Sequence, residues 1–329
     1  MGQRSQIAVG SPQGCRPRVA GRCRIVTPLP LSTQRIVVTG ANAGLGFACS
    51  EALARDGAEV VFACRNEAKA RAAMARIERQ QPDARLHFVA LDLSDLASVR
   101  DCARAIRESF GHIDGLCNNA GIMGVPRQTT RDGFERHLGT NYLGHFALTG
   151  LLMPALLEAP RARVVSVTSL SHHTVTLDLE DLQLTRGYGR WRAYARSKLA
   201  NLMFSMELHR RCTRAQLPLI SAAAHPGYAA TDLLAHRPEE GGPSWLSRIA
   251  VLGNTVVAQS AVFGALPILA CFRTRRLLGG EFFGPDGWQE LAGQPSRARP
   301  SRHARDPSVA AALWDASVEL TGVSYEALT

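Results

Sequence analysis

The chain has 329 residues, 46% of them hydrophobic, which is enough to bury a sizeable core in one or two domains. Its net charge of +10 comes from arginines spread along predicted helices, without a basic run interleaved with aromatic residues. This pattern argues against nucleic-acid binding as the main function.

The first 33 residues carry five arginines and no acidic residue, and they lack the apolar core of a secretory signal. Prolines and glycines interrupt any amphipathic transit helix there. We therefore expect residues 1–33 to be a flexible tail or the product of an incorrectly assigned start codon. The fold should begin near Pro28, with the domain proper covering residues 34–329.

A glycine-rich turn follows the first apolar run. Residues 35–39 are mostly β-branched and predict a buried parallel strand, and residues 47–56 have the apolar spacing of a helix. Between them the spacing is Gly-x3-Gly-x-Gly, over Gly40, Gly44 and Gly46. A strand, glycine turn and helix in this order predict a dinucleotide site, because glycines let the backbone approach a pyrophosphate at the helix N-terminus.

The end of the second predicted strand, residues 59–64, indicates which dinucleotide is preferred. A carboxylate there would bind the ribose 2′-hydroxyl of NAD. This chain has Cys64 and Arg65 instead. Because a guanidinium matches phosphate geometry, Arg65 favours the 2′-phosphate of NADP(H).

Tyr194 and Lys198 form the second chemical signal. The chain contains only two lysines, Lys69 and Lys198, and residues four apart share one helix face. An ammonium beside a phenol lowers the pKa of that phenol, which suits proton exchange with a substrate oxygen. The pair predicts a general acid/base, although an ordinary surface pair has the same spacing.

Eight cysteines are present, and none forms a Cys-x2-Cys pair, so no zinc or other metal site is expected. Several lie in predicted strands or helices, where cysteine packs as a small apolar residue. This use of cysteine suits a reducing compartment, and we expect a cytoplasmic protein. We interpret His172 and His173 as pocket or surface residues, because adjacent side chains point in different directions.

Residues 249–272 include no charged residue, and by length they could span a membrane. Polar residues and Pro267 interrupt them, so buried or pocket-lining helices are the preferred interpretation, and contact with a membrane surface stays open. Residues 279–284 predict the last strand and turn, residues 294–306 a loop, and residues 307–321 a final helix that Gly322 ends.

Alternating strands and helices predict a single α/β domain, with a doubly wound sheet of seven parallel strands and helices on both faces. The strands centre near Val38, Val61, Phe88, Leu116, Val165, Ala222 and Phe282. Right-handed crossovers would place the active site at the carboxyl ends of these strands.

Together these segments resemble the short-chain dehydrogenase/reductase family from about Gln34 to Gly284. The resemblance implies a Rossmann fold with strand order 3-2-1-4-5-6-7 and a catalytic set of Asn141, Ser169, Tyr194 and Lys198. It also implies cofactor contacts from a larger set: Thr39, Gly40, Asn42, Gly44, Leu45, Gly46, Arg65, Asp92, Leu93, Asn119, Ala120, Gly121, Tyr194, Lys198, Pro226, Gly227 and Thr231.

Three phrases are similar to a narrower group that includes retinol dehydrogenases, the WW-domain-containing oxidoreductase and light-dependent protochlorophyllide reductases. They are Gly-Ala-Asn-Ala-Gly-Leu-Gly, Asn-Tyr-Leu-Gly-His-Phe and His-Pro-Gly. This resemblance implies interconversion of a carbonyl and an alcohol on bulky, apolar small-molecule substrates such as an aldehyde, ketone or retinoid. With Arg65 as the signal for the cofactor, we expect an NADP(H)-dependent enzyme, and a monomer or homodimer. Substrate-lid helices are expected over about residues 232–272.

Two other functions remain open at this level. A non-catalytic NADP(H)-sensing or scaffold protein would keep the dinucleotide fold without the chemistry. A protochlorophyllide reductase-like enzyme would reduce a C=C bond in light. The insert between Ser169 and Tyr194, roughly residues 172–192, could border the substrate pocket or form a helical cap.

Overall fold

The computed structural model describes residues 30–227 and 261–328, which build one α/β domain around an eight-stranded sheet. The strand order is β3-β2-β1-β4-β5-β6-β7-β8. The strands are β1 (Arg35–Thr39), β2 (Glu59–Cys64), β3 (Leu86–Ala90), β4 (Gly115–Asn118), β5 (Arg163–Val167), β6 (Ile220–Ala224), β7 (Phe282–Pro285) and β8 (Pro295–Arg297).

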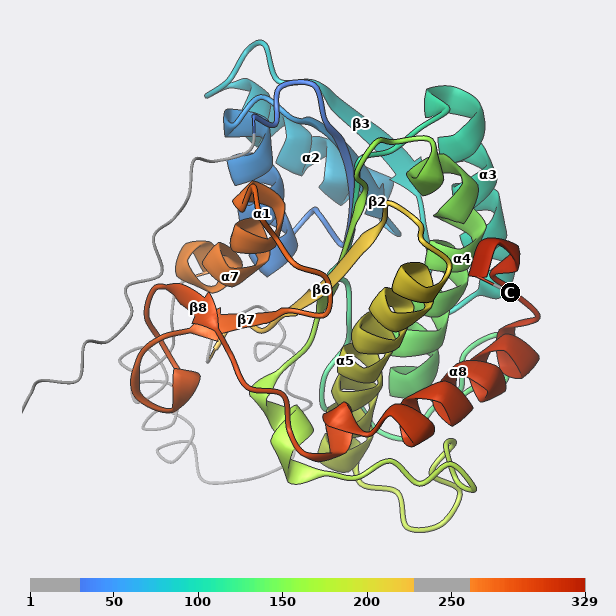
Figure 1. Cartoon of the computed structure of the whole chain (residues 1–329). Coiled ribbons are helices and arrows are strands. Elements are labelled where there is room, and N and C mark those ends of the chain that lie inside the picture. Colours follow the sequence, from blue (N-terminus) through green and yellow to red (C-terminus); the bar gives the residue numbers. More distant parts are fainter. Residues whose placement is uncertain (1–29, 228–260, 329) are drawn as a thin grey trace, which may run out of the picture.

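Helices cover both faces of the sheet, as the doubly wound pattern predicts (Figure 1). One face carries α1 (Gly44–Arg55), α2 (Glu67–Glu78) and α7 (Ala261–Arg273). The other carries α3 (Leu96–Phe110), α4 (Gly144–Leu157) and α5 (Arg190–Arg214), with α8 (Pro307–Thr321) packed outside α5. Along β1, Ile36 and Val38 face the first layer and Val37 faces the second, which is the two-residue period of a strand.

The number of strands differs from the prediction of seven parallel strands. β1 to β7 are parallel, but β8 adds an antiparallel edge, with Phe283 opposite Arg297. The sequence of β8 is Pro-Ser-Arg, inside the segment predicted as a loop. A three-residue strand that starts with proline has no alternating pattern to detect, and proline is tolerated there because the strand lies at an edge.

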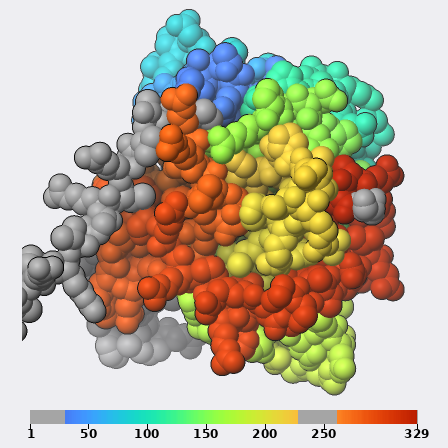
Figure 2. Space-filling view, in the orientation of Figure 1, coloured from blue at the N-terminus to red at the C-terminus, as the bar shows by residue number. Residues whose placement is uncertain are grey.

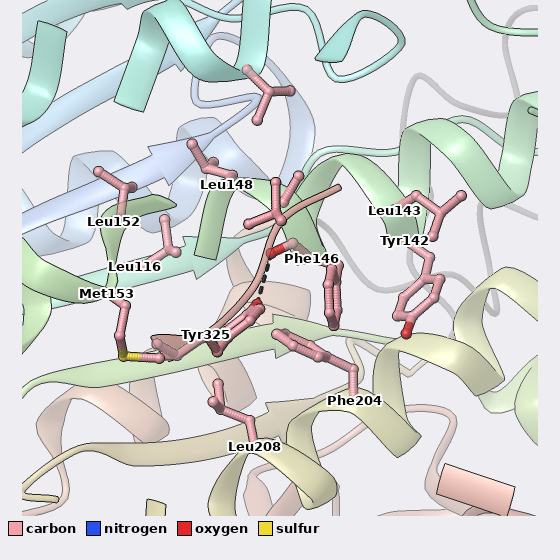
Figure 3. Close-up of a cluster of buried hydrophobic side chains, with 14 of the residues drawn as sticks. Leu116, Tyr142, Leu143, Phe146, Leu148, Leu152, Met153, Phe204, Leu208 and Tyr325 are labelled. Atoms are coloured by element: carbon pink, nitrogen blue, oxygen red, sulfur yellow. Dashed lines mark hydrogen bonds between the residues drawn. The ribbon is translucent and has the colours of Figure 1, made fainter. Parts of the chain in front are cut away.

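A cluster of aromatic side chains, which includes Phe146 of α4, Phe204 of α5 and Tyr325, packs beside the sheet (Figure 3). The Phe146 ring lies 5.6 Å from Phe204 and 5.1 Å from Trp314, both in edge-to-face geometry. Tyr325, near the end of the chain, donates its hydroxyl to the Phe146 carbonyl at 2.7 Å. The cluster holds α4 and α5 rigidly, and these helices carry or adjoin three of the expected catalytic residues.

The uncharged stretch 249–272 is described only in its second half. There it forms α7, whose Ala265, Ile268 and Phe272 are buried against the sheet. Within the described ranges, we find no helix of the length and apolarity needed to cross a membrane.

Candidate active site

The turn between β1 and α1 has the geometry of an anion-binding loop. Gly40 has a φ of +66°, which favours glycine, and a Cβ on Gly46 would collide with the Gly40 carbonyl and the Asn119 side chain. Ala43 precedes α1 and offers no side-chain cap, and the first turn of the helix holds no acidic residue. The first N–H groups of α1 therefore remain available to an anion such as a pyrophosphate.

Thr39 ties this turn to the end of β4. Its hydroxyl accepts the backbone N–H groups of Asn119 and Ala120, each at 2.9 Å, and its carbonyl accepts the Asn119 amide at 2.8 Å. Two neighbouring strand ends are thereby locked together. Thr39, Gly40, Asn119 and Ala120 thus lie at one edge of the sheet, as the sequence predicts.

The carboxyl ends of β2 and β3 carry the other residues that we expect to contact the cofactor at this edge of the sheet. Arg65, directly after β2, is exposed and makes no ion pair within the described ranges. Burial raises the pKa of the neighbouring Cys64 thiol to about 11, so it stays neutral beside the turn. After β3, Asp92 accepts the Ser94 hydroxyl at 2.6 Å, and the Leu93 carbonyl lies so close to Gly144 that a Cβ there would collide with it.

Asn141 lies in a π-helical segment, Leu138–Leu143, that leads into α4. Its side-chain oxygen accepts the Ile122 N–H at 2.8 Å, and its amide donates to the Ile122 carbonyl at 3.0 Å and to Ser197 at 2.9 Å. Asn141 therefore connects the loop after β4 to α5. π-Helical turns of this kind often occur at functional sites.

Ser169, Tyr194 and Lys198 meet where β5 ends against α5. The Lys198 ammonium donates to the Val167 carbonyl of β5 at 3.0 Å and lies 5.9 Å from the centre of the Tyr194 ring. The Ser169 side chain hydrogen-bonds to Tyr194. A Cβ on Gly121 would lie 3.1 Å from the Asn141 side-chain oxygen and 3.6 Å from Lys198 Nζ, so these groups share one small volume.

The electrostatics differ from the sequence-based interpretation in one respect. Burial raises the pKa of Tyr194, and only the bond with Ser169 opposes it, so the expected lowering by Lys198 is absent. Burial is the main cause of the raised pKa of Tyr194, and the bond that the Lys198 ammonium makes is to the Val167 carbonyl. Burial also lowers the pKa of Lys198 to about 8. This structure thus contains a neutral phenol beside a desolvated amine.

The loop after β6 is held by a histidine–carboxylate pair. His225 is fully buried, its Nε2 lies 2.9 Å from a Glu290 carboxylate oxygen, and its Nδ1 accepts the Gly227 N–H at 3.2 Å. Gly227 has a φ of +70°, and a Cβ there would collide with the Leu291 carbonyl. Pro226 and Gly227 are thereby placed beside the sheet edge, whereas Thr231 and residues 232–260 of the expected lid lie outside the described ranges.

The segment between β5 and α5 forms no α-helix, so the helical-cap alternative for this insert is not realised. It begins with a 3₁₀ turn, Leu170–Thr174, and continues as irregular chain to α5. Arg196 of α5 donates to the carbonyls of Asp178 and Asp181 at 2.7 and 2.9 Å. These bonds fasten the insert to the helix that carries Tyr194.

Sequence analysis did not identify several residues that support the site. His145 joins the Asn141 carbonyl, 2.8 Å from its Nδ1, to the Thr39 hydroxyl, 2.9 Å from its Nε2. Burial lowers the pKa of His145 to about 4, so the neutral ring donates from Nδ1 and accepts at Nε2. A histidine four residues after Asn141 on one helix face was the available signal.

A second buried pair lies near Tyr194. His137 is fully buried, its Nδ1 lies 2.9 Å from a Glu135 carboxylate oxygen, and its ring centre is 6.4 Å from that of Tyr194. Burial tends to raise the pKa of Glu135, but bonds from the His137 side chain and from two backbone N–H groups keep it below its usual value. The Glu-x-His spacing of Glu135 and His137, a few residues before Asn141, was the signal for this pair.

His172, interpreted from sequence as a pocket or surface residue, is completely buried. Its Nδ1–H donates to the Ser169 carbonyl at 2.6 Å, and its Nε2 accepts the Ser301 N–H at 3.2 Å. Burial lowers its pKa to about 4. His172 therefore anchors the strand end that carries Ser169 to a segment 129 residues further along the chain.

His172→Leu is expected to destabilise the protein by about 2 kcal/mol, because it leaves the Ser301 N–H buried without a partner and removes one of the two N–H donors of the Ser169 carbonyl. Protonation of His172 favours the unfolded chain, so its contribution is complete above pH 6.5 and falls as the pH drops toward 4. Urea unfolding of both proteins at several pH values checks this. A difference between wild type and variant that stays constant from pH 7 to pH 4 would contradict it.

Among the described residues, no group of three or more histidines, cysteines or acidic side chains could hold a metal ion. All the cysteines in those ranges are free and buried: Cys49, Cys64, Cys102, Cys117, Cys212 and Cys271.

The parallel sheet, the glycine turn and this polar cluster define a dinucleotide-dependent oxidoreductase. The short chain dehydrogenase pattern matches residues 34–241, and the chain belongs to this family. It is 36% identical to retinol dehydrogenase 12 of Homo sapiens over 308 residues, covering 93% of this chain and 91% of that protein. Polyprenol dehydrogenase of Mus musculus is 37% identical, with 96% and 92% covered.

The fold also matches solved structures. A crystal structure of an uncharacterized protein from Mycobacterium Paratuberculosis superimposes with a TM-score of 0.73 at 39% sequence identity, covering 91% of this chain and 97% of that one. Since the named relatives are retinol and polyprenol dehydrogenases, the chain is an oxidoreductase of the short chain dehydrogenase family related to them.

Proposed function

We propose that the protein interconverts a carbonyl and an alcohol on an apolar aldehyde, ketone or retinoid-like substrate, with NADP(H) as cofactor and Tyr194 as general acid/base. The observation that carries this proposal is the convergence of Ser169, Tyr194 and Lys198 between β5 and α5, opposite Asn141. The apolar substrate class is supported by the named relatives, retinol and polyprenol dehydrogenases.

The glycine turn, the uncapped α1 N-terminus and the Pro226–Gly227 loop fit a dinucleotide along the strand ends. When bound, the nicotinamide supplies or accepts the hydride. Ser169 donates a hydrogen bond to the substrate oxygen and holds it beside Tyr194. In reduction Tyr194 gives its proton to that oxygen, and in oxidation it removes the proton.

Lys198, by its place next to Gly121 and beside the Tyr194 ring, is suited to bind the nicotinamide ribose. Asn141 holds a water through which protons reach Lys198 from solvent. A pKa of about 8 lets Lys198 give up and regain a proton near neutral pH, which suits this relay.

The test of the proposed function is oxidation of NADPH and NADH by purified protein with a panel of apolar aldehydes and ketones, including retinal. Absence of turnover across the panel despite tight NADPH binding would favour a sensing role.

Arg65→Ala is expected to raise the dissociation constant of NADPH by about 10-fold and to leave that of NADH unchanged. The reason is that a guanidinium–phosphate bond of about 1.5–3 kcal/mol is available only to the 2′-phosphate. Fluorescence titration with each cofactor measures this. Arg104→Ala is the matched control, because Arg104 is exposed on α3 and paired with Asp101. Equal weakening of both cofactors in Arg65→Ala would refute the role.

A further inference from the structure

Trp191 stands in line with the proposed acid/base pair. It precedes Tyr194 by three residues and Lys198 by seven in α5, and this spacing places all three on one helix face. Trp191 is thus one turn further out than Tyr194 along the same face. Whatever approaches Tyr194 along this side of α5 passes the indole.

Most of α5 is buried, but the Trp191 side chain is 54% exposed. Its ring packs beside Gly124, in the loop that follows Asn119–Gly121, where a Cβ would lie 3.1 Å from the nearest ring carbon. The φ of +66° at Gly124 also favours glycine. The indole therefore packs against the Gly124 backbone, in the loop that follows Asn119–Gly121, and about half of the Trp191 surface is exposed to solvent.

A solvent-open depression of about 430 Å³ adjoins this ring, lined by Thr174, Val175, Thr176, Trp191 and Arg192. Its walls come from two segments that carry the site, the chain shortly after Ser169 and the start of α5. The volume lies within the range of about 300–1,000 Å³ of small-molecule pockets. The segment after Ser169 belongs to the projecting lower edge of the molecule, below α8 (Figure 2).

We propose that Trp191 and Val175 form a binding channel for the hydrocarbon chain of the substrate, with Thr174, Thr176 and Arg192 as its polar rim. The inference rests on the proposed function, which places the reacting oxygen at Ser169 and Tyr194. An extended chain or polyene that starts there and follows the face of α5 covers the exposed indole. Burial of apolar surface on the indole, rather than a polar contact, gives the affinity.

The test measures binding, not turnover, of 1-decanol and 1-butanol to the full chain by calorimetry, with and without NADP⁺. Trp191→Ala is expected to raise the dissociation constant of decanol by about 10-fold or more, the size of an apolar-pocket effect. The same change is expected to weaken butanol binding much less, because a four-carbon chain covers less of the indole. Trp191→Phe, which keeps a flat apolar ring, recovers most of the decanol affinity.

Trp288→Ala is the matched control, since Trp288 is 77% exposed in the 3₁₀ turn Trp288–Glu290, and its loss leaves decanol binding unchanged. Wild-type protein that does not bind decanol overturns the inference, as does equal weakening of both alcohols in Trp191→Ala. Turnover is scored separately with decanal. Decanol binding that depends on Trp191 without reduction of decanal by either cofactor would overturn the proposed function and leave the channel standing.

Discussion

Tyr194→Phe is expected to lower kcat by about 10²-fold or more, the scale of general acid catalysis, and to leave the dissociation constant of NADPH nearly unchanged. The phenylalanine ring keeps the packing of Tyr194 against its neighbours, and only the proton donor is lost. Ser169 can still hold the substrate oxygen, so KM should change less than kcat. Steady-state kinetics with the best aldehyde of the panel, together with NADPH titration, gives both numbers.

The matched control is Tyr325→Phe, which also removes one tyrosine hydroxyl. Tyr325 donates to the Phe146 carbonyl in the aromatic cluster, away from the sheet edge (Figure 3). Its loss should cost about 1 kcal/mol of stability and leave kcat unaltered. If Tyr194→Phe keeps near-normal turnover, or if both variants lose kcat equally, Tyr194 is not the acid/base.

The parts of the site that the sequence predicts are those with local signals. Gly40 and Gly46 follow a β-branched strand, and Tyr194 and Lys198 share a helix face, so the chain order alone places them on the correct elements. Parallel strands then bring their carboxyl ends to one edge. For this reason the glycine turn and the polar cluster could be expected together before any geometry was available.

The parts that could not be predicted depend on contacts between distant segments. The bond from Ser301 to His172 and the pairing of β7 with β8 leave no periodic pattern in either partner. Burial raises the pKa of the Tyr194 phenol, and the spacing of Lys198 from Tyr194 could not show that burial. Spacing predicts which residues share a face, whereas burial and partners determine their charge.

Lys198→Met is expected to abolish most activity and yet to stabilise the cofactor-free protein at neutral pH. Lys198 is 95% buried and its ammonium donates to the Val167 carbonyl, and the fall of its pKa from 10.5 to about 8 corresponds to about 3 kcal/mol. Methionine fills similar space without that desolvation penalty. The Val167 carbonyl keeps the Asn201 amide at 3.3 Å as a donor.

The pH dependence separates this effect from a change in packing. Because the folded-state pKa of Lys198 lies below its unfolded value, the unfolded chain binds more protons between pH 8 and 10.5, and wild-type stability gains from Lys198 as the pH rises through that window. The advantage of Lys198→Met should therefore be greatest at or below pH 8 and shrink toward pH 10. Urea unfolding from pH 7 to 9.5 measures it, and kcat/KM should fall by about 10²-fold in parallel assays. A variant that is less stable than wild type by the same amount at every pH would show that Lys198 contributes to stability through packing alone. The burial of the ammonium would then carry no desolvation penalty for a bound cofactor to offset.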